Sequence, residues 1–288
     1  MALERLVARR PRGWQGRSTV FATPGDRRCC GQVFSPGVLS PGARFSNLLV
    51  YIHGDGRRFQ YLLDALRPFA RLAGVLVLAP LFPADLIGDG NTDGYKLLRE
   101  GDLRYDEILL DLVDTLRGVY TFDDDRFLLG GFSGGGQFAH RFAYLHPRRL
   151  RAVSIAAPSA VTLLDEDLPW WTGVADVEAR LGRPIDFEGL HDLPVHLVVG
   201  EKDLAAAAGP DRSGDPRLAG PTRVARLATL QASLAARGVA ARLAVVPDAG
   251  HDFSLLLPEI EAFFASVLFT ESPAAPEGPT PADPPPAN

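Results

Sequence analysis

The sequence contains little lysine and little cysteine, and each shortage excludes a class of protein. Lysine occurs only at Lys96 and Lys202, although lysine and arginine together number 30. A phosphate-binding loop ends in a lysine after a glycine-rich turn, and neither lysine follows such a turn. The two cysteines, Cys29 and Cys30, are neighbours. Neighbouring cysteines cannot join distant segments, so we expect no disulfide framework and, without a histidine nearby, no metal site.

Long apolar runs and an excess of basic charge are also missing. No run approaches the ~20 apolar residues that span a bilayer. The arginine-rich residues 1–18 lack the apolar segment and small-residue cleavage site of a secretory signal. We therefore expect a cytoplasmic protein with no membrane partner. The net charge of −5 disfavours a nucleic-acid partner, because phosphate groups require a basic surface.

Short apolar, β-branched runs alternate with amphipathic segments along most of the chain. The runs predict strands buried on both faces, at residues 47–53, 74–80, 126–131, 150–158, 194–200 and 241–247. Apolar residues recur with helical spacing in residues 59–70, 105–119 and, after Pro258, 260–268. This alternation predicts an α/β fold with a mostly parallel sheet, preceded by an antiparallel hairpin from residues 17–23 and 29–34.

Three stretches depart from this alternation. Residues 158–192 are too long for a plain connection between strands, so we predict a small cap insertion over the carboxyl edge of the sheet. Residues 81–102 form a second irregular excursion from the end of a strand. The tail, residues 270–288, is rich in proline and alanine and is predicted to be disordered. One domain therefore covers residues 1–269.

The glycine-rich turn after the strand at 126–131 contains a candidate nucleophile. Residues 131–135 match Gly-x-Ser-x-Gly and open a helix, which is the context that a nucleophile elbow requires. A serine held in a strained turn needs neighbours without bulk two residues before and after it, and Gly131 and Gly135 provide this. Ser133 then lies at a helix N-terminus, where developing negative charge is stabilised.

A candidate acid and a candidate base follow Ser133 in the chain. A serine hydroxyl needs an adjacent base that is itself oriented by an acid. Asp203 comes just after the strand at 194–200, and His251 follows the strand at 241–247. The order serine, acid, histidine, each on a turn after a strand, predicts that all three meet at one edge of the sheet.

Other acids and histidines compete for these roles. Glu201 lies two residues from Asp203, while Asp248 and Asp252 flank His251. The position of Asp203 at the end of the penultimate strand favours it. We expect His53 to stabilise a loop and His140 to be a buried structural residue.

Two backbone amides are candidates for an oxyanion hole, which needs donors directed at a developing negative oxygen. One is the amide of Gly134, directly after the serine. The other comes from the turn at residues 53–56, where Asp55 is favoured and Gly56 is the alternative.

Several aromatic residues are candidates for a substrate pocket, which is commonly lined by apolar rings. Trp170 and Trp171 lie in the cap insertion, and Phe82 and Tyr95 lie in or next to the 81–102 excursion. Phe132 directly precedes the candidate nucleophile.

The chain resembles the α/β-hydrolase superfamily of serine esterases over residues 17–269. The motifs HGDG at 53–56, GFSGGG at 131–136 and YLHPRRLRAVS at 144–154 are similar to the polyhydroxybutyrate-depolymerase and feruloyl-esterase branch. The resemblance implies a Ser–Asp–His triad, ester hydrolysis through an acyl-enzyme, and no cofactor. Secreted depolymerases have a leader, a cysteine framework and a substrate-binding module, and we expect none of the three here. We therefore expect small esters rather than polymer.

The sequence thus predicts a serine hydrolase acting on carboxylic esters, including aromatic or hydroxyalkanoate esters. An amidase, a peptidase or an acyltransferase could use the same triad. A catalytically silent ligand receptor on the same fold is the alternative from another class.

Overall fold

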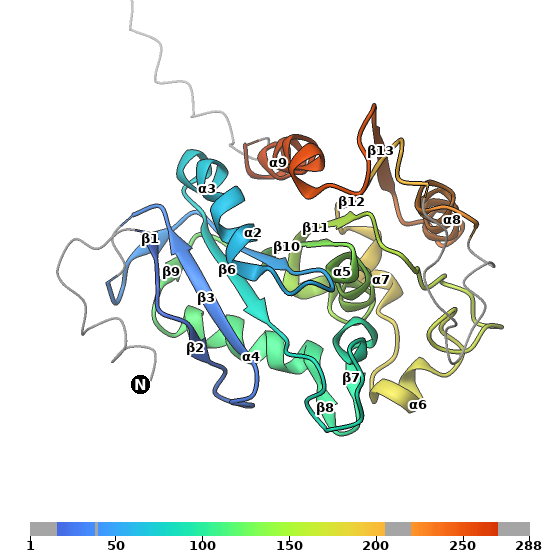
Figure 1. Cartoon of the computed structure of the whole chain (residues 1–288), viewed down its shortest axis with the longest axis horizontal. Helices are drawn as coiled ribbons and strands as arrows, with labels where there is room; N and C mark the ends of the chain where they lie inside the picture. The colour runs from blue at the N-terminus through green and yellow to red at the C-terminus, as the bar shows by residue number, and fades with distance from the viewer. Residues whose placement is uncertain (1–15, 38–39, 205–219, 270–288) are drawn as a thin grey trace, which may run out of the picture.

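A computed structural model describes residues 16–37, 40–204 and 220–269 of the chain (Figure 1). The predicted disordered tail at 270–288 lies outside these residues. Within the described ranges, no helix is long and apolar enough to cross a membrane.

A mixed sheet of nine strands forms the centre of the fold. Its strands are β1 (Gly16–Arg17), β2 (Phe21–Ala22), β3 (Cys30–Ser35), β5 (Leu48–Ile52), β6 (Leu76–Leu81), β10 (Phe127–Phe132), β11 (Leu150–Ala156), β12 (Val195–Gly200) and β13 (Ala241–Val246). The order is β1-β3-β6-β5-β10-β11-β12-β13, and β2 also pairs with β3. Strands β5, β6 and β10 to β13 are parallel to their neighbours in this group, whereas β3 is antiparallel to β1, β2 and β6. The predicted hairpin and parallel sheet are therefore confirmed.

Helices cover both faces of this sheet. They are α2 (Phe59–Ala65), α3 (Arg67–Ala73), α4 (Tyr105–Arg117), α5 (Gly134–Leu145), α6 (Val177–Leu181), α7 (Phe187–His191), α8 (Arg223–Ala236) and α9 (Phe253–Phe269), with 3-10 turns η1 (Gly94–Leu97) and η2 (Pro147–Arg149). Two small ladders pair β4 (Arg44–Phe45) with β9 (Thr121–Phe122) and β7 (Arg99–Glu100) with β8 (Leu103–Arg104). In Figure 1, α2, α3 and α9 lie on one face of the sheet and α4, α5 and α8 on the other.

The structure corrects three details of the predicted elements. Strand β13 is the edge of the sheet and has no fully buried residue, so it is not buried on both faces as expected. The segment at 59–70 forms two short helices that meet at Leu66. Helix α9 begins at Phe253 and contains Pro258 inside it, rather than beginning after the proline. Pro258 is the sixth residue of α9 and lacks the N–H that would donate to the carbonyl of Ser254, so this turn of the helix has one backbone hydrogen bond fewer.

The insertion at residues 158–192 packs beside α5 and α8. The hydroxyl of Tyr144 in α5 donates to the carbonyl of Thr162 (2.7 Å), and the amide of Leu164 donates to the hydroxyl of Ser233 in α8 (2.8 Å). Its apolar side chains, such as Val161 and Leu164, are buried in the core. A role as a cap over the site stays a prediction.

The start of α5 approaches the sheet too closely for any side chain. A Cβ at Gly131 would overlap the carbonyl of Gly135, and a Cβ at Gly135 would overlap the carbonyl of Ile52 in β5. These contacts are with backbone atoms, which cannot rotate away. The requirement for glycine on both sides of Ser133 therefore has a steric cause.

We expect Gly135→Ala to destabilise the protein by about 2 kcal/mol or more, because overpacking against backbone forces the helix away from the sheet. This corresponds to a melting temperature lower by about 4–8 °C, measured by circular dichroism. Gly250→Ala is the matched control, since a Cβ there has nothing within 4 Å. Equal melting temperatures for the two variants would contradict this account.

Candidate active site

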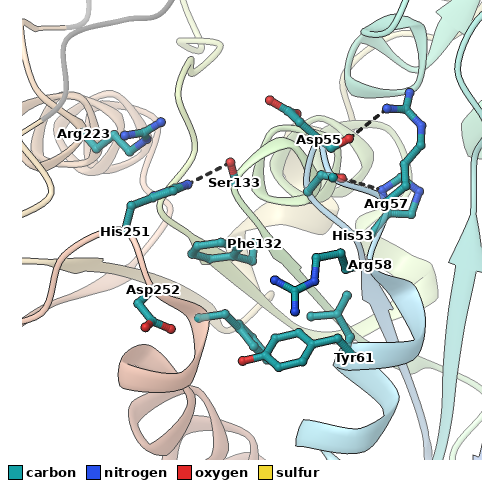
Figure 2. A pocket seen from close by; sticks show the side chains of 14 residues that line it. His53, Asp55, Arg57, Arg58, Tyr61, Phe132, Ser133, Arg223, His251 and Asp252 are labelled. Carbon is teal, nitrogen blue, oxygen red and sulfur yellow. Dashed lines mark hydrogen bonds between the residues drawn. The ribbon is translucent and has the colours of Figure 1, made fainter.

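Ser133 stands at the junction of β10 and α5 in a strained backbone conformation. Its φ is 58° and its ψ is −116°, a region that costs a residue with a side chain about 1–3 kcal/mol. Its amide donates to the carbonyl of Ala156 at the end of β11 (2.8 Å), which helps to hold the turn. The side chain lies beside a cavity, as Figure 2 shows.

Ser133, His251 and Asp203 form one continuous hydrogen-bonded chain. Nε2 of His251 is 3.1 Å from the Ser133 hydroxyl oxygen, and Nδ1 is 2.6 Å from Oδ2 of Asp203. Because a carboxylate only accepts, Nδ1 carries the hydrogen and Nε2 is free to accept from the serine. Asp203 is 2% exposed, whereas the His251 side chain is 32% exposed. The structure thus brings together the three residues that the sequence singled out.

The competing acids are bound elsewhere in the same loops. Glu201 accepts the amide of Asp248 (3.1 Å), and Asp248 forms an ion pair with Lys202 (2.7 Å). Asp252 accepts from the amide and hydroxyl of Ser254, and these bonds lower the pKa of its carboxyl. None of the three accepts from His251.

Arg223 is a member of the site that the sequence analysis missed. Its Nη1 donates to Oδ1 of Asp203 (2.7 Å), so that both carboxylate oxygens are bound, one to Arg223 and one to His251. The Arg223 side chain is 10% exposed. It is the first residue of α8, after Thr222, whose hydroxyl accepts the amide of Ala225. Nothing in the sequence separates this arginine from the many others.

His53 holds the turn at residues 53–56 in place. Its Nδ1–H donates to the carbonyl of Gly54 (2.8 Å), and Nε2 accepts the amide of Phe82 (3.0 Å). Complete burial lowers the pKa of His53 to about 4, so the imidazole is neutral at pH 7. The hydroxyl of Tyr95 donates to the His53 carbonyl (3.3 Å). These contacts match the loop-stabilising role expected for this histidine.

Two basic residues tie the same turn to the 81–102 excursion. The Arg57 guanidinium donates to the carbonyls of Asp55, Phe82 and Thr92. Nζ of Lys96, on η1, lies 2.7 Å from the carboxylates of both Asp55 and Asp93. The excursion therefore supports the backbone around Asp55.

The two candidate oxyanion amides belong to segments in contact. Gly134 is the first residue of α5, where a backbone N–H has no partner within the helix. A Cβ at Gly134 would meet the carboxylate of Asp55 and the hydroxyl of Tyr95. The oxyanion role of the amides of Gly134 and Asp55 stays a prediction.

A cavity of about 570 Å³ opens beside Ser133 and His251. This lies within the range of about 300–1,000 Å³ for small-molecule sites. It is lined by His53, Gly54, Asp55, Gly56, Arg57, Arg58, Tyr61, Leu62, Phe132, Ser133, Arg223, His251, Asp252 and Phe253. Among the described residues, no group of three or more His, Cys, Asp or Glu side chains could hold a metal ion.

Of the five predicted pocket aromatics, only Phe132 lines this cavity. Phe82 and Tyr95 are buried beneath it, at 0% and 1% exposure, next to His53. Trp170 and Trp171 are also buried, and their rings lie 5.8 Å and 5.4 Å from the guanidinium of Arg141 in α5. The placement of these four residues in the pocket wall is therefore corrected: they support the wall or pack in the core.

Comparison with known proteins identifies the fold. No family model matches the chain, and no curated protein sequence does. Among solved structures, a poly(3-hydroxybutyrate) depolymerase from Bordetella parapertussis matches with a TM-score of 0.69 at 22% identity, covering 95% of this chain and 94% of its own. A poly(aspartic acid) hydrolase from Sphingomonas sp. KT-1 matches with a TM-score of 0.68 at 20% identity, and the match covers 86% of this chain and 98% of the hydrolase. An S-formylglutathione hydrolase from Agrobacterium tumefaciens matches with a TM-score of 0.59 at 16% identity, and the match covers 89% of this chain and 95% of that hydrolase.

The chain has the α/β-hydrolase fold. This confirms the fold class that the motifs predicted. Within the α/β-hydrolase fold, the cavity lies at the carboxyl ends of the parallel strands, because Ser133 follows β10, Asp203 follows β12 and His251 follows β13.

We expect Arg223 and Asp203 to be strongly coupled in stability, because their hydrogen-bonded ion pair is almost fully buried. In a double-mutant cycle with Arg223→Met and Asp203→Asn, followed by urea unfolding, the coupling energy should be about 2 kcal/mol. The matched control is the exposed pair of Arg237 and Glu166, for which we expect less than about 1 kcal/mol. A coupling energy no larger than in this control would show that the contact between Arg223 and Asp203 does not stabilise the fold.

The neutral state of buried His53 makes stability depend on pH. Its pKa of about 4 in the folded protein lies below the usual 6.5, so the unfolded chain binds the proton first as the pH falls. Stability present above pH 6.5 is therefore lost as the pH falls from about 6.5 to about 4. The free energy of unfolding, measured with urea at pH 7.5 and at pH 4.5, should decrease between these two pH values in the wild type. In His53→Gln this decrease should be smaller by about 2–3 kcal/mol. Equal decreases would refute this contribution.

Proposed function

We propose that the chain is a serine hydrolase that cleaves carboxylic esters through an acyl-enzyme. The observation that carries this proposal is the unbroken hydrogen-bonded chain from the Ser133 hydroxyl through His251 to Asp203, beside the 570 Å³ cavity. A base in contact with the hydroxyl, oriented in turn by an acid, is what makes serine a nucleophile.

In the first half of the reaction, Ser133 attacks the ester carbonyl. Nε2 of His251 accepts the hydroxyl proton as the new C–O bond forms, and Asp203 stabilises the resulting imidazolium. The amides of Gly134 and Asp55 donate to the oxyanion. His251 then gives its proton to the leaving alkoxide, so that the alcohol departs and the acyl group stays on Ser133.

In the second half, water replaces the alcohol. His251 accepts a proton from the water as it attacks the acyl carbon, and then returns the proton to the Ser133 oxygen as the acid is released. Arg223 supports both halves indirectly, because it holds the second oxygen of Asp203 and compensates its buried charge.

The substrate class that we propose is based on the cavity and not on the similar structures. The similar structures are named for hydrolysis of polyesters, poly(aspartic acid) and S-formylglutathione, and their low identity transfers none of these substrates. We favour small esters that enter the cavity whole. Hydrolysis of amides or peptides, and acyl transfer to another alcohol, use the same triad and are the alternative activities. A silent receptor is disfavoured because the serine, histidine and aspartate are all present and in contact.

Removal of the Ser133 hydroxyl should abolish ester hydrolysis. We expect Ser133→Ala to lower kcat for p-nitrophenyl acetate by about a thousandfold or more without changing the circular dichroism spectrum. A fluorophosphonate probe should label the wild type and fail to label this variant. Ser266→Ala, on α9 outside the cavity lining, is the matched control. Wild-type turnover by Ser133→Ala would overturn the proposal.

The choice of acid can be tested separately. Asp203→Asn should lower kcat by about 10⁴-fold, because an amide favours the wrong tautomer of His251. Glu201→Gln, which changes an acid bound to a loop amide, should cost less than about tenfold. If the two effects are reversed, then Glu201 is the acid and Asp203 is not.

A further inference from the structure

One cation of the cavity lies over an aromatic ring and is bound to no acid among the residues that the structure describes. Arg58 precedes α2 and lines the same cavity as Ser133 and His251 (Figure 2). Its guanidinium carbon lies 4.6 Å from the centre of the Tyr61 ring. Stacking on a ring orients the planar guanidinium and leaves its N–H groups free to donate within the plane.

The other two arginines of the cavity are already occupied. Arg57 donates to three backbone carbonyls, and Arg223 binds Asp203. The described part of the chain provides no hydrogen bond and no ion pair for the guanidinium of Arg58, which lies over the ring of Tyr61. Its donors are therefore available to a ligand in the cavity.

The acids that line the cavity do not neutralise Arg58. Asp55 forms its ion pair with Lys96, and Asp252 accepts two hydrogen bonds from Ser254. Arg223 is paired with Asp203 and Arg57 donates to backbone carbonyls, so Arg58 is the lining cation whose donors no described residue occupies. An anionic ligand group is the chemistry that complements this end of the cavity.

A wall of aromatic rings runs from Arg58 to the candidate base. The Tyr61 ring lies 6.1 Å from the Phe253 ring, and Phe253 lies 5.7 Å from Phe132. Phe132 in turn stacks on the His251 imidazole at 4.6 Å. An apolar or aromatic ligand body along this wall would place its two ends near Arg58 and near Ser133.

We propose that Arg58 binds the carboxylate of an ester substrate whose apolar or aromatic body lies on the wall of Tyr61, Phe253 and Phe132. The carboxylate selects the substrate, and the ester group at the other end reaches Ser133. This inference rests on the proposed ester hydrolase activity and names the class of its substrate: esters that carry a second, free carboxylate.

The test compares two esters that differ in one charged group. These are 4-acetoxybenzoate and its neutral analogue 4-acetoxybenzamide, and the quantity measured is the ratio of their kcat/KM values. In Arg58→Gln this ratio should fall about tenfold or more relative to the wild type, since a hydrogen bond to a charged group is lost. Any effect of the variant common to both esters cancels in the ratio. Arg58→Lys should retain part of the preference, and 1 M salt should weaken it in the wild type.

The matched control is Arg71→Gln on α3. Arg71 also stacks on a ring, 5.5 Å from the centre of Phe34, but does not line the cavity. Its ratio should equal that of the wild type. An unchanged ratio in Arg58→Gln, or an equal fall in Arg71→Gln, would overturn the proposal.

A binding measurement separates this inference from the proposed activity. Calorimetry with 4-acetoxybenzoate uses Ser133→Ala, which cannot be acylated, and the double variant that also contains Arg58→Gln. Weaker binding by about tenfold in the double variant supports the subsite even if the wild type hydrolyses neither ester, in which case the hydrolase proposal alone fails. Equal binding by both proteins refutes the carboxylate subsite.

Discussion

The burial of the Asp203 carboxylate is the constraint on which the arrangement of the site depends. A buried charge is costly unless hydrogen bonds and an opposite charge compensate it. Here Arg223 binds one oxygen and His251 the other. Because the two partners come from α8 and from the turn after β13, compensating this one charge also fixes where both segments lie. The imidazole orientation that catalysis would need thus follows from the requirements of a buried acid.

A second set of contacts serves the opposite side of the nucleophile. The turn at residues 53–56 is held through His53, Arg57 and Lys96, and each of these contacts reaches into the 81–102 excursion or comes from it. The backbone amide of Asp55 can act on a reacting oxygen only if its direction is fixed beforehand, since reorganisation during the reaction would cost free energy. The long excursion is therefore explained as a support for this turn. It does not provide the cavity wall that its aromatic residues first suggested.

The sequence predicted those parts of the site in which local pattern and chain order carry the information. The elbow is recognisable because backbone overlap leaves only glycine at Gly131 and Gly135, and parallel strands bring Asp203 and His251 to the same edge. Arg223 could not be found in this way, because its role comes from a tertiary contact with Asp203 and its local sequence is ordinary. The tryptophans were misplaced for a related reason. Trp170 and Trp171 pack against the buried guanidinium of Arg141, and composition alone does not distinguish a core ring from a pocket ring.

Reaction and selectivity draw on different parts of this molecule. The groups proposed to do chemistry stand at the ends of β10, β12 and β13, where strand register fixes their separation. Arg58 and Tyr61 belong instead to the start of α2, at the other end of the ring wall. Because α2 contributes no member of the hydrogen-bonded chain from Ser133 to Asp203, its surface residues can differ without disturbing that chain. A change at Arg58 should therefore alter which esters bind far more than how a bound ester reacts. Such a separation between reacting groups and binding groups is one way in which a single fold can serve hydrolases with different substrates.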